Sequence, residues 1–161
     1  MSPKSRKVQQ FSTRAGVTAA VAVAMLVGIG GPAAATPTDP VVQFTPTLTR
    51  VPGGKCAAVI NGETVPQAQS GVFGVRVKIT QTGQFCGPYR VAVRWRNLDS
   101  GYSDGQSHRV DENGVITATD GVIVGMGTAL GVGRVEASIV TTYEDGREME
   151  YLAGTAAFTL G

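Results

Sequence analysis

The sequence contains very few of the residues that catalytic and metal sites use. Its 161 residues include one histidine, His108, and two cysteines, Cys56 and Cys86. A single imidazole excludes sites that need two histidines, and it leaves a serine or cysteine nucleophile without an obvious base. A metal site built from the two thiols is the weaker interpretation, because only one histidine exists to join them. We therefore expect no metal and no cofactor.

Aromatic residues are also scarce, at 6% of the chain. So few rings argue against a carbohydrate-binding surface on which sugar rings stack. Trp95 alternates with arginines along the sequence, so we expect its side chain in the core.

The chain has one long apolar run, Ala15 to Gly30, and no second run of that length. The run is shorter than the roughly 20 residues that cross a bilayer. Four basic residues precede it: Lys4, Arg6, Lys7 and Arg14. The small residues Ala33-Ala34-Ala35 follow it as a cleavage site, so we expect residues 1–35 to be a cleaved secretory signal. The composition resembles signals of high-GC Gram-positive bacteria and predicts a secreted bacterial protein, starting near Thr36, without a transmembrane anchor.

Removal of the signal changes the charge balance. The signal carries four of the 14 Lys and Arg residues and none of the 12 Asp and Glu residues. The remaining chain has ten basic and twelve acidic residues, so its formal net charge is −2. We therefore expect no nucleic-acid partner.

The two cysteines are the only pair available to an exported chain. In an oxidising compartment, Cys56 and Cys86 are expected to form a disulfide. The chain-entropy model assigns such a bridge about 3–4 kcal/mol of stabilisation. We expect it to join the N-terminal strand region to the loop that precedes a strand beginning at Tyr89.

The pattern after the signal predicts an all-β fold. Residues 36–40 are a flexible, proline-rich leader. Five Asx-Gly dipeptides then mark tight turns, and no segment has sustained helical periodicity. Alternation is clearest in Tyr89 to Arg96 and Phe73 to Thr80, followed by Arg134 to Tyr143 and a last strand from Glu148 to Phe158. The shorter candidates are Val41 to Val51, Lys55 to Ile60, Arg109 to Val110, Val115 to Thr119 and Val122 to Val124.

Seven or eight short strands over residues 41–161 indicate one antiparallel β-sandwich or small barrel. The pattern resembles the immunoglobulin-like and fibronectin-type-III-like sandwiches at the level of the fold. The sequence differs from a true immunoglobulin domain because both cysteines precede Trp95. The expected core consists of Phe73, Val75, Val77, Tyr89, Val91, Val93, Trp95, Val135 and Ile139.

Gly101-Tyr102-Ser103-Asp104-Gly105 matches the G-x-S-x-G pattern of hydrolase nucleophiles. That pattern needs a strand, a sharp turn and then a helix, whereas the segment after Gly105 soon reaches the turn Asn113-Gly114. We therefore expect a polar loop and no catalytic residues. A small serine hydrolase using Ser103 is the alternative.

The glycine-rich segment Gly125 to Gly133 lacks the spacing of a phosphate-binding loop, because Leu130 stands where the third glycine is needed. A loop on a rigid β scaffold often carries binding. The segment is thus a candidate recognition loop, or the loop of a secreted enzyme inhibitor. Its candidate residues are Gly125, Met126, Gly127, Leu130, Gly131 and Gly133.

The most specific feature is the placement of cations. Arg76 and Lys78 share the polar face of one strand, and Arg90, Arg94 and Arg96 share that of the next. If these two strands form a hairpin, five cations line one surface and are a candidate face for an anionic ligand. In an immunoglobulin-like topology the two strands lie in opposite sheets. Acidic residues of the C-terminal hairpin are the competing partners of these arginines: Glu136, Glu144, Asp145, Glu148 and Glu150.

These observations predict a secreted, non-catalytic binding module of the bacterial cell exterior. Its partner is an unidentified protein or an anionic glycan of the cell envelope.

Overall fold

The computed structural model describes residues 39–126 and 131–161. The predicted signal, residues 1–35, and residues 36–38 of the predicted leader lie outside this part. No helix within the described residues has the length and apolar character that a membrane crossing requires.

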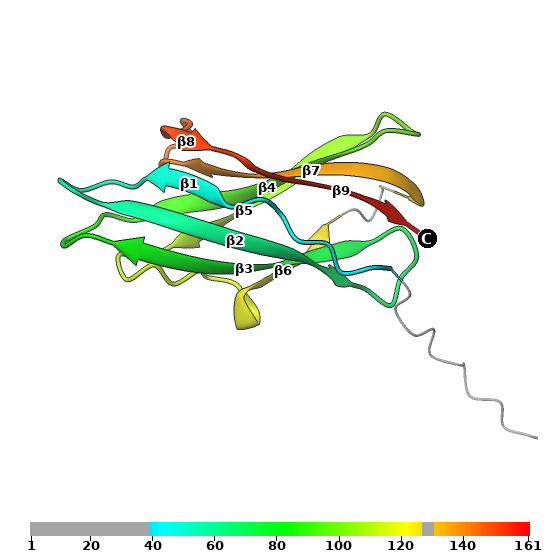
Figure 1. The fold of residues 1–161 in the computed structure, drawn as a ribbon, viewed down its shortest axis with the longest axis horizontal. Helices are drawn as coiled ribbons and strands as arrows, with labels where there is room; N and C mark the ends of the chain where they lie inside the picture. The colour runs from blue at the N-terminus through cyan, green and yellow to red at the C-terminus, as the bar shows by residue number, and fades with distance from the viewer. Residues whose placement is uncertain (1–38, 127–130) are drawn as a thin grey trace, which may run out of the picture. The chain divides into compact units, whose positions relative to one another are not determined.

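The described chain forms two antiparallel sheets that pack face to face (Figure 1). One sheet has five strands in the order β6-β3-β2-β1-β8, and the other has four in the order β5-β4-β7-β9. The strands are β1 (Thr47–Arg50), β2 (Ala57–Pro66), β3 (Phe73–Thr82), β4 (Tyr89–Asn97), β5 (Ser103–Val110), β6 (Val122–Met126), β7 (Gly133–Thr142), β8 (Tyr151–Leu152) and β9 (Gly154–Leu160), with one short 3-10 turn, η1 (Thr119–Gly121). The all-β prediction is confirmed, but the described residues contain nine strands rather than seven or eight.

Several predicted strands have different bounds in the structure, among them Val41 to Val51, of which only Thr47–Arg50 is a strand, and Lys55 to Ile60, where the strand is Ala57–Pro66. Val115 to Thr119 is not a strand and contributes only an isolated bridge between Ile116 and Val110. The predicted last strand is two strands, because the chain leaves the five-stranded sheet after β8 and enters the four-stranded sheet at Gly154. A Cβ atom at Gly154 would overlap the carbonyl oxygen of Thr45, so this close crossing requires glycine.

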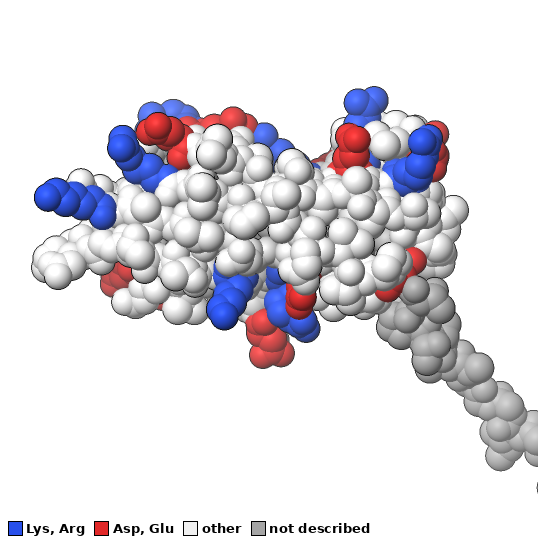
Figure 2. Space-filling model, in the orientation of Figure 1, with Lys and Arg blue, Asp and Glu red and all other residues white. Residues whose placement is uncertain are grey.

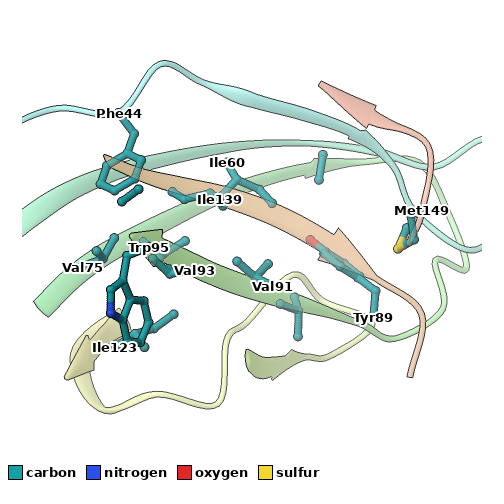
Figure 3. Close-up of a cluster of buried hydrophobic side chains, with 14 of the residues drawn as sticks. Phe44, Ile60, Val75, Tyr89, Val91, Val93, Trp95, Ile123, Ile139 and Met149 are labelled. Carbon is teal, nitrogen blue, oxygen red and sulfur yellow. The ribbon is translucent and has the colours of Figure 1, made fainter. Parts of the chain in front are cut away.

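The core lies between the sheets and consists of the apolar faces of the alternating strands. All nine predicted core residues are buried. In Figure 3, Ile60 and Val75 of one layer face Val93 and Ile139 of the other. Phe73 makes edge-to-face contacts with Trp95 and Phe158, at centroid distances of 5.8 and 5.0 Å. Burial of each such side chain contributes about 1.5–3 kcal/mol relative to exposure.

The predicted disulfide is confirmed. Cys56 and Cys86 are bonded, with their Cα atoms 5.7 Å apart. The bridge joins the β1–β2 turn to the β3–β4 connection, and both loops project at the same end of the sandwich, at the left of Figure 1. Gly83 permits this packing: it has a φ of +116°, and a Cβ there would lie 2.6 Å from the carbonyl oxygen of Lys55.

Candidate functional site

The five predicted cations do not share one surface. β3 pairs with β2 and β6, whereas β4 pairs with β5 and β7. Arg76 and Lys78 therefore lie on the outer face of the five-stranded sheet, and Arg90, Arg94 and Arg96 lie on the outer face of the four-stranded sheet. The hairpin hypothesis is wrong because residues 83–88 form a disulfide-bound crossover between sheets and not a tight hairpin turn.

On the four-stranded sheet, the three arginines stand over a floor of small side chains. Across the β4–β5 pair, Arg94 lies opposite Gly105 and Arg96 lies opposite Ser103. Between Arg90 and Arg94, the outward position on β4 is Ala92, which lies opposite Ser107. Small residues beside long ones leave an open groove of about 680 Å³ that reaches from β4 and β5 to the turn after β7.

The segment after β7 forms one wall of this groove. Arg94 Nη1 lies 2.6 Å from Glu148 Oε1, and Arg109 Nε lies 2.6 Å from Glu144 Oε1. The hydrogen bond from Arg94 is the main cause that lowers the pKa of the Glu148 carboxyl, and a second bond from the Tyr151 hydroxyl adds to it. Both ion pairs are about half exposed, so each is open to competition from another anion.

Arg90 and Arg96 have different surroundings from Arg94. Arg90 donates from Nε to Ser107 Oγ at 2.8 Å and from Nη2 to the Ser107 carbonyl oxygen at 2.9 Å. Arg96 lies opposite Glu136 across the β4–β7 pair. Among the described residues, neither Arg90 nor Arg96 has a carboxylate within ion-pair distance.

A second groove of about 610 Å³ continues on the other side of Arg94. Arg96, Glu136 and Ser138 line it together with two small residues of β9, Thr155 and Ala157. Arg94 also lines this groove, so it stands between the two hollows. The arginines Arg90, Arg94 and Arg96 with these two grooves are hereafter called the arginine face.

The cations of the five-stranded sheet are arranged differently. Arg76 Nη1 lies 2.7 Å from Glu63 Oε1, and Gln43 donates to the other carboxylate oxygen at 2.8 Å. These bonds, that from Gln43 first, lower the pKa of the Glu63 carboxyl. Arg76 therefore belongs to a local network with Glu63 and Gln43.

Ser103 and His108 are not brought together. Both lie on β5, and an odd separation along a strand places their side chains on opposite faces of the sheet. The Nδ1 atom of His108 is 3.5 Å from the carbonyl oxygen of Thr117. After Ser103 the chain continues as a strand to Val110, so the helix of a nucleophile elbow does not follow.

The predicted glycine-rich loop is only partly described. Gly125 and Met126 end β6, whereas Gly127 and Leu130 lie outside the described residues. Gly131 has a φ of +69°, and Gly133 begins β7 with a φ of +131°. Nearby, Asp99 accepts from the backbone and guanidinium of Arg134, at 2.9 and 2.7 Å, which anchors the start of β7.

The sequence interpretation missed one exposed feature. Phe85, next to the disulfide, has 96% of its surface exposed. The signal for it was present: the phenylalanine lies in Gly83-Gln84-Phe85-Cys86-Gly87-Pro88, a run of turn-forming residues in which a large side chain has no strand to bury it.

The described residues hold no cluster of three or more His, Cys, Asp or Glu side chains suited to a metal ion. Comparison of the chain with protein-family models, with curated proteins and with solved structures finds no match.

Proposed function

We propose that this protein is a secreted, non-catalytic binding module of the bacterial cell exterior, and that its arginine face binds an anionic polymer of the cell envelope. The observation that carries the proposal is the register of Arg90, Arg94 and Arg96 along one strand, above a floor of glycine, alanine and serine. Such a surface presents guanidinium donors to carboxylates or phosphates with little steric obstruction.

The shape of the face favours an extended ligand over a compact one. Both grooves are open, and Arg94 lies between them. Alternate residues of a strand are about 7 Å apart, so the arginines present repeated positive charge along the strand direction. A polymer with regularly spaced anions matches this arrangement better than a small molecule, which favours an enclosed apolar pocket.

The Arg94–Glu148 pair supports exchange with an external anion. Its atoms are in contact at 2.6 Å, but both side chains are about half exposed. An exposed pair of this kind contributes little net stability. A ligand anion therefore displaces Glu148 from Arg94 at small cost, and the displaced carboxylate regains its solvation.

The proposed secretion is supported by the sequence of residues 1–35 and by the disulfide. The bond between Cys56 and Cys86 is of the kind that persists in oxidising compartments.

We also propose that the sandwich is immunoglobulin-like. β4 is central to the four-stranded sheet with β5 on one side and β7 then β9 on the other, as strand C is with C′, F and G. β3 lies between β2 and β6, as strand B lies between A and E. The disulfide departs from the usual position, since it joins two loops rather than the two sheets.

Co-sedimentation with isolated bacterial cell envelopes, at low and at high salt, tests the function. The variant Arg90→Gln/Arg94→Gln/Arg96→Gln should lose at least about 10-fold in binding at low salt, and the remaining binding should no longer depend on salt. The matched control is Arg50→Gln/Arg76→Gln/Lys78→Gln, which removes three cations from the five-stranded sheet instead. Equal losses in both variants would show that net charge alone governs binding, and absence of wild-type binding would remove the proposal.

A further inference from the structure

Phe85 combines a strained backbone with an exposed apolar side chain. Its φ is +56°, in the left-handed region that few non-glycine residues adopt. Its ring is 96% exposed, so the ring gains almost nothing from the core. A strained backbone that presents an apolar side chain to solvent indicates a role in contact with another surface.

The loop that carries Phe85 is firmly braced. Cys86 is bonded to Cys56 directly after it. The Gly87 amide donates to the carbonyl oxygen of Pro52 at 2.7 Å, and a Cβ at Gly53 would lie 2.9 Å from the carbonyl oxygen of Phe85. Bracing of this kind lowers the entropic cost of placing one ring into a pocket.

The same chain carries a matching apolar groove. Three aliphatic side chains on the outer face of the five-stranded sheet form a cross-strand row: Leu152 of β8, Leu48 of β1 and Val59 of β2. They are 68%, 46% and 37% exposed. They line an open groove of about 450 Å³. In Figure 2, charged atoms lie along the upper and lower margins and at the left end of the visible face, and the middle of that face is uncharged.

We propose that two copies of this chain associate by reciprocal insertion of Phe85 of each copy into the aliphatic groove of the other. Among the described residues, Phe85 has the only large apolar side chain that is almost fully exposed. The groove supplies aliphatic walls that an aromatic ring covers well. In such a dimer the groove covers the ring and the ring fills the groove, which accounts for the exposure of both in the single chain.

Charge complementarity supports a second copy as the occupant. Lys55 lies beside Phe85 and shares a shallow hollow with it. Glu150 lines the aliphatic groove, where the only ion-pair partner of its carboxylate among the described residues is Arg50, at 3.4 Å with both side chains more than three-quarters exposed. Insertion of Phe85 therefore brings the Lys55 ammonium of one copy toward the Glu150 carboxylate of the other.

The positions of ring and groove suit a two-fold axis. Ala57 lines the groove and directly follows Cys56, so the groove begins beside the disulfide that braces Phe85. Two copies that overlap at this end can satisfy both contacts at once, as an isologous interface requires. The arginine face, on the other sheet, stays free, so this inference is independent of the proposed function.

A lipid surface is a poorer match for Phe85. One ring inserts less apolar surface than a myristoyl chain, and even a myristoyl chain gives only marginal membrane binding. A pocket in a protein surface, in contrast, gains much from a single rigid aromatic anchor.

Sedimentation velocity on residues 36–161, which contain all the core residues that the structure describes, tests the proposal. The contact is small, so we expect a reversible dimer with a Kd on the order of 10–100 µM. Phe85→Ser should weaken association about 100-fold, because a hot-spot ring is lost from both copies. Leu152→Ser should weaken it by about 10-fold or more. Val115→Ser is the matched control: Val115 is 60% exposed, lies outside the groove, and its loss should change nothing.

A charge exchange distinguishes this geometry from any other dimer. Lys55→Glu and Glu150→Lys should each weaken association, and the double variant should restore it. A wild-type chain that stays monomeric up to about 1 mM, well above the expected Kd, overturns the proposal. So does a dimer that Phe85→Ser leaves intact, or a monomer whose Phe85 instead mediates binding to phosphatidylglycerol vesicles.

Discussion

The outer faces of the two sheets are built by the same alternation of side chains but differ in what the outward positions carry. The five-stranded sheet carries Arg50, Arg76 and Lys78, and the four-stranded sheet carries Arg90, Arg94, Arg96, Arg109 and Arg134. On the four-stranded sheet small residues separate them and grooves form. On the five-stranded sheet, Leu48, Val59 and Leu152 occupy the outward positions and form an apolar row.

The two faces differ in what surrounds each cation. The side chains of Arg94 and Arg76 are almost equally exposed, at 50% and 52%, so the size of the neighbouring side chains distinguishes the two sites. On the four-stranded sheet, Gly105 and Ala92 flank Arg94 and leave it open on both sides. On the five-stranded sheet, Arg76 donates to Glu63, whose other carboxylate oxygen accepts from Gln43.

The largest change in the free energy of unfolding should come from substitutions in the core, which lies between the two sheets. Tyr89 is fully buried, and its hydroxyl has no hydrogen-bond partner among the described residues. Tyr89→Ala should lower the free energy of unfolding by about 3–5 kcal/mol, as removal of a buried ring does. Tyr89→Phe should leave it unchanged or raise it by up to about 1 kcal/mol, because only an unpaired buried hydroxyl is lost. Urea unfolding measures both values.

Alkaline pH gives an independent check on Tyr89. Burial raises the pKa of its hydroxyl from 10.0 to about 12. A raised pKa contributes stability that is present below pH 10 and is lost as the pH rises toward 12, because the unfolded chain ionises first. The wild type should therefore lose more stability than Tyr89→Phe between pH 9 and 11. Equal losses would mean that the hydroxyl is solvated in the folded chain.

The next largest loss of stability should come from removal of the disulfide between Cys56 and Cys86. The bonded cysteines are 30 residues apart, for which loop-closure entropy predicts about 3–4 kcal/mol. Cys56→Ala/Cys86→Ala should lose this amount in urea unfolding, and dithiothreitol should have no effect on the variant. The loss should also loosen the loop that carries Phe85 while the arginine face keeps its structure. Chemical shifts that change on β4 as strongly as at residues 83–87 would contradict this localisation.

The smallest expected effect is a change in the pKa of one carboxylate on each face, Glu148 on one and Glu63 on the other. Arg94 holds the pKa of Glu148 below its ordinary value of 4.5, whereas Gln43 and then Arg76 do so for Glu63. Arg94→Gln should raise the pKa of Glu148 and leave that of Glu63 unchanged. Arg76→Gln should raise the pKa of Glu63 and leave that of Glu148 unchanged. The rise at Glu63 should be partial, because Gln43 still donates to its carboxylate. Side-chain NMR titration measures both values.

The sign of the accompanying stability change follows from linkage. A lowered carboxylate pKa contributes stability above pH 4.5, and this contribution is lost as the pH falls through the lowered value. Each variant should therefore lose less stability than the wild type on acidification below pH 4.5. A variant that becomes more acid-sensitive would contradict the assigned pairs.

The sequence predicted what alternation and residue counts determine. The apolar positions of β3 and β4 identify the core, because any packing of those strands must bury Val75, Val77, Val91 and Val93. The disulfide follows from the presence of only two cysteines. Neither prediction requires knowledge of which strands are neighbours.

The sequence did not reveal which strands are neighbours in the sheets. The cationic face of five side chains assumed that β3 and β4 form a hairpin, and alternation is the same whichever partner a strand has. β5 was also missed over most of its length, since Ser103 to Arg109 has no apolar alternation. It is an edge strand that forms by pairing with β4. The two grooves depend on both features and could not be predicted without them.

The path of the last strand has a consequence for when the fold can form. Phe158 of β9 packs against Phe73, and the carbonyl oxygen of Gly161 accepts hydrogen bonds from the amide of Gly71 and the hydroxyl of Ser70. A nascent chain that ends before β9 therefore has an open core, with Phe73 uncovered on one side. Because such distant contacts close late and slowly, we expect the chain to fold only when synthesis has passed Leu160.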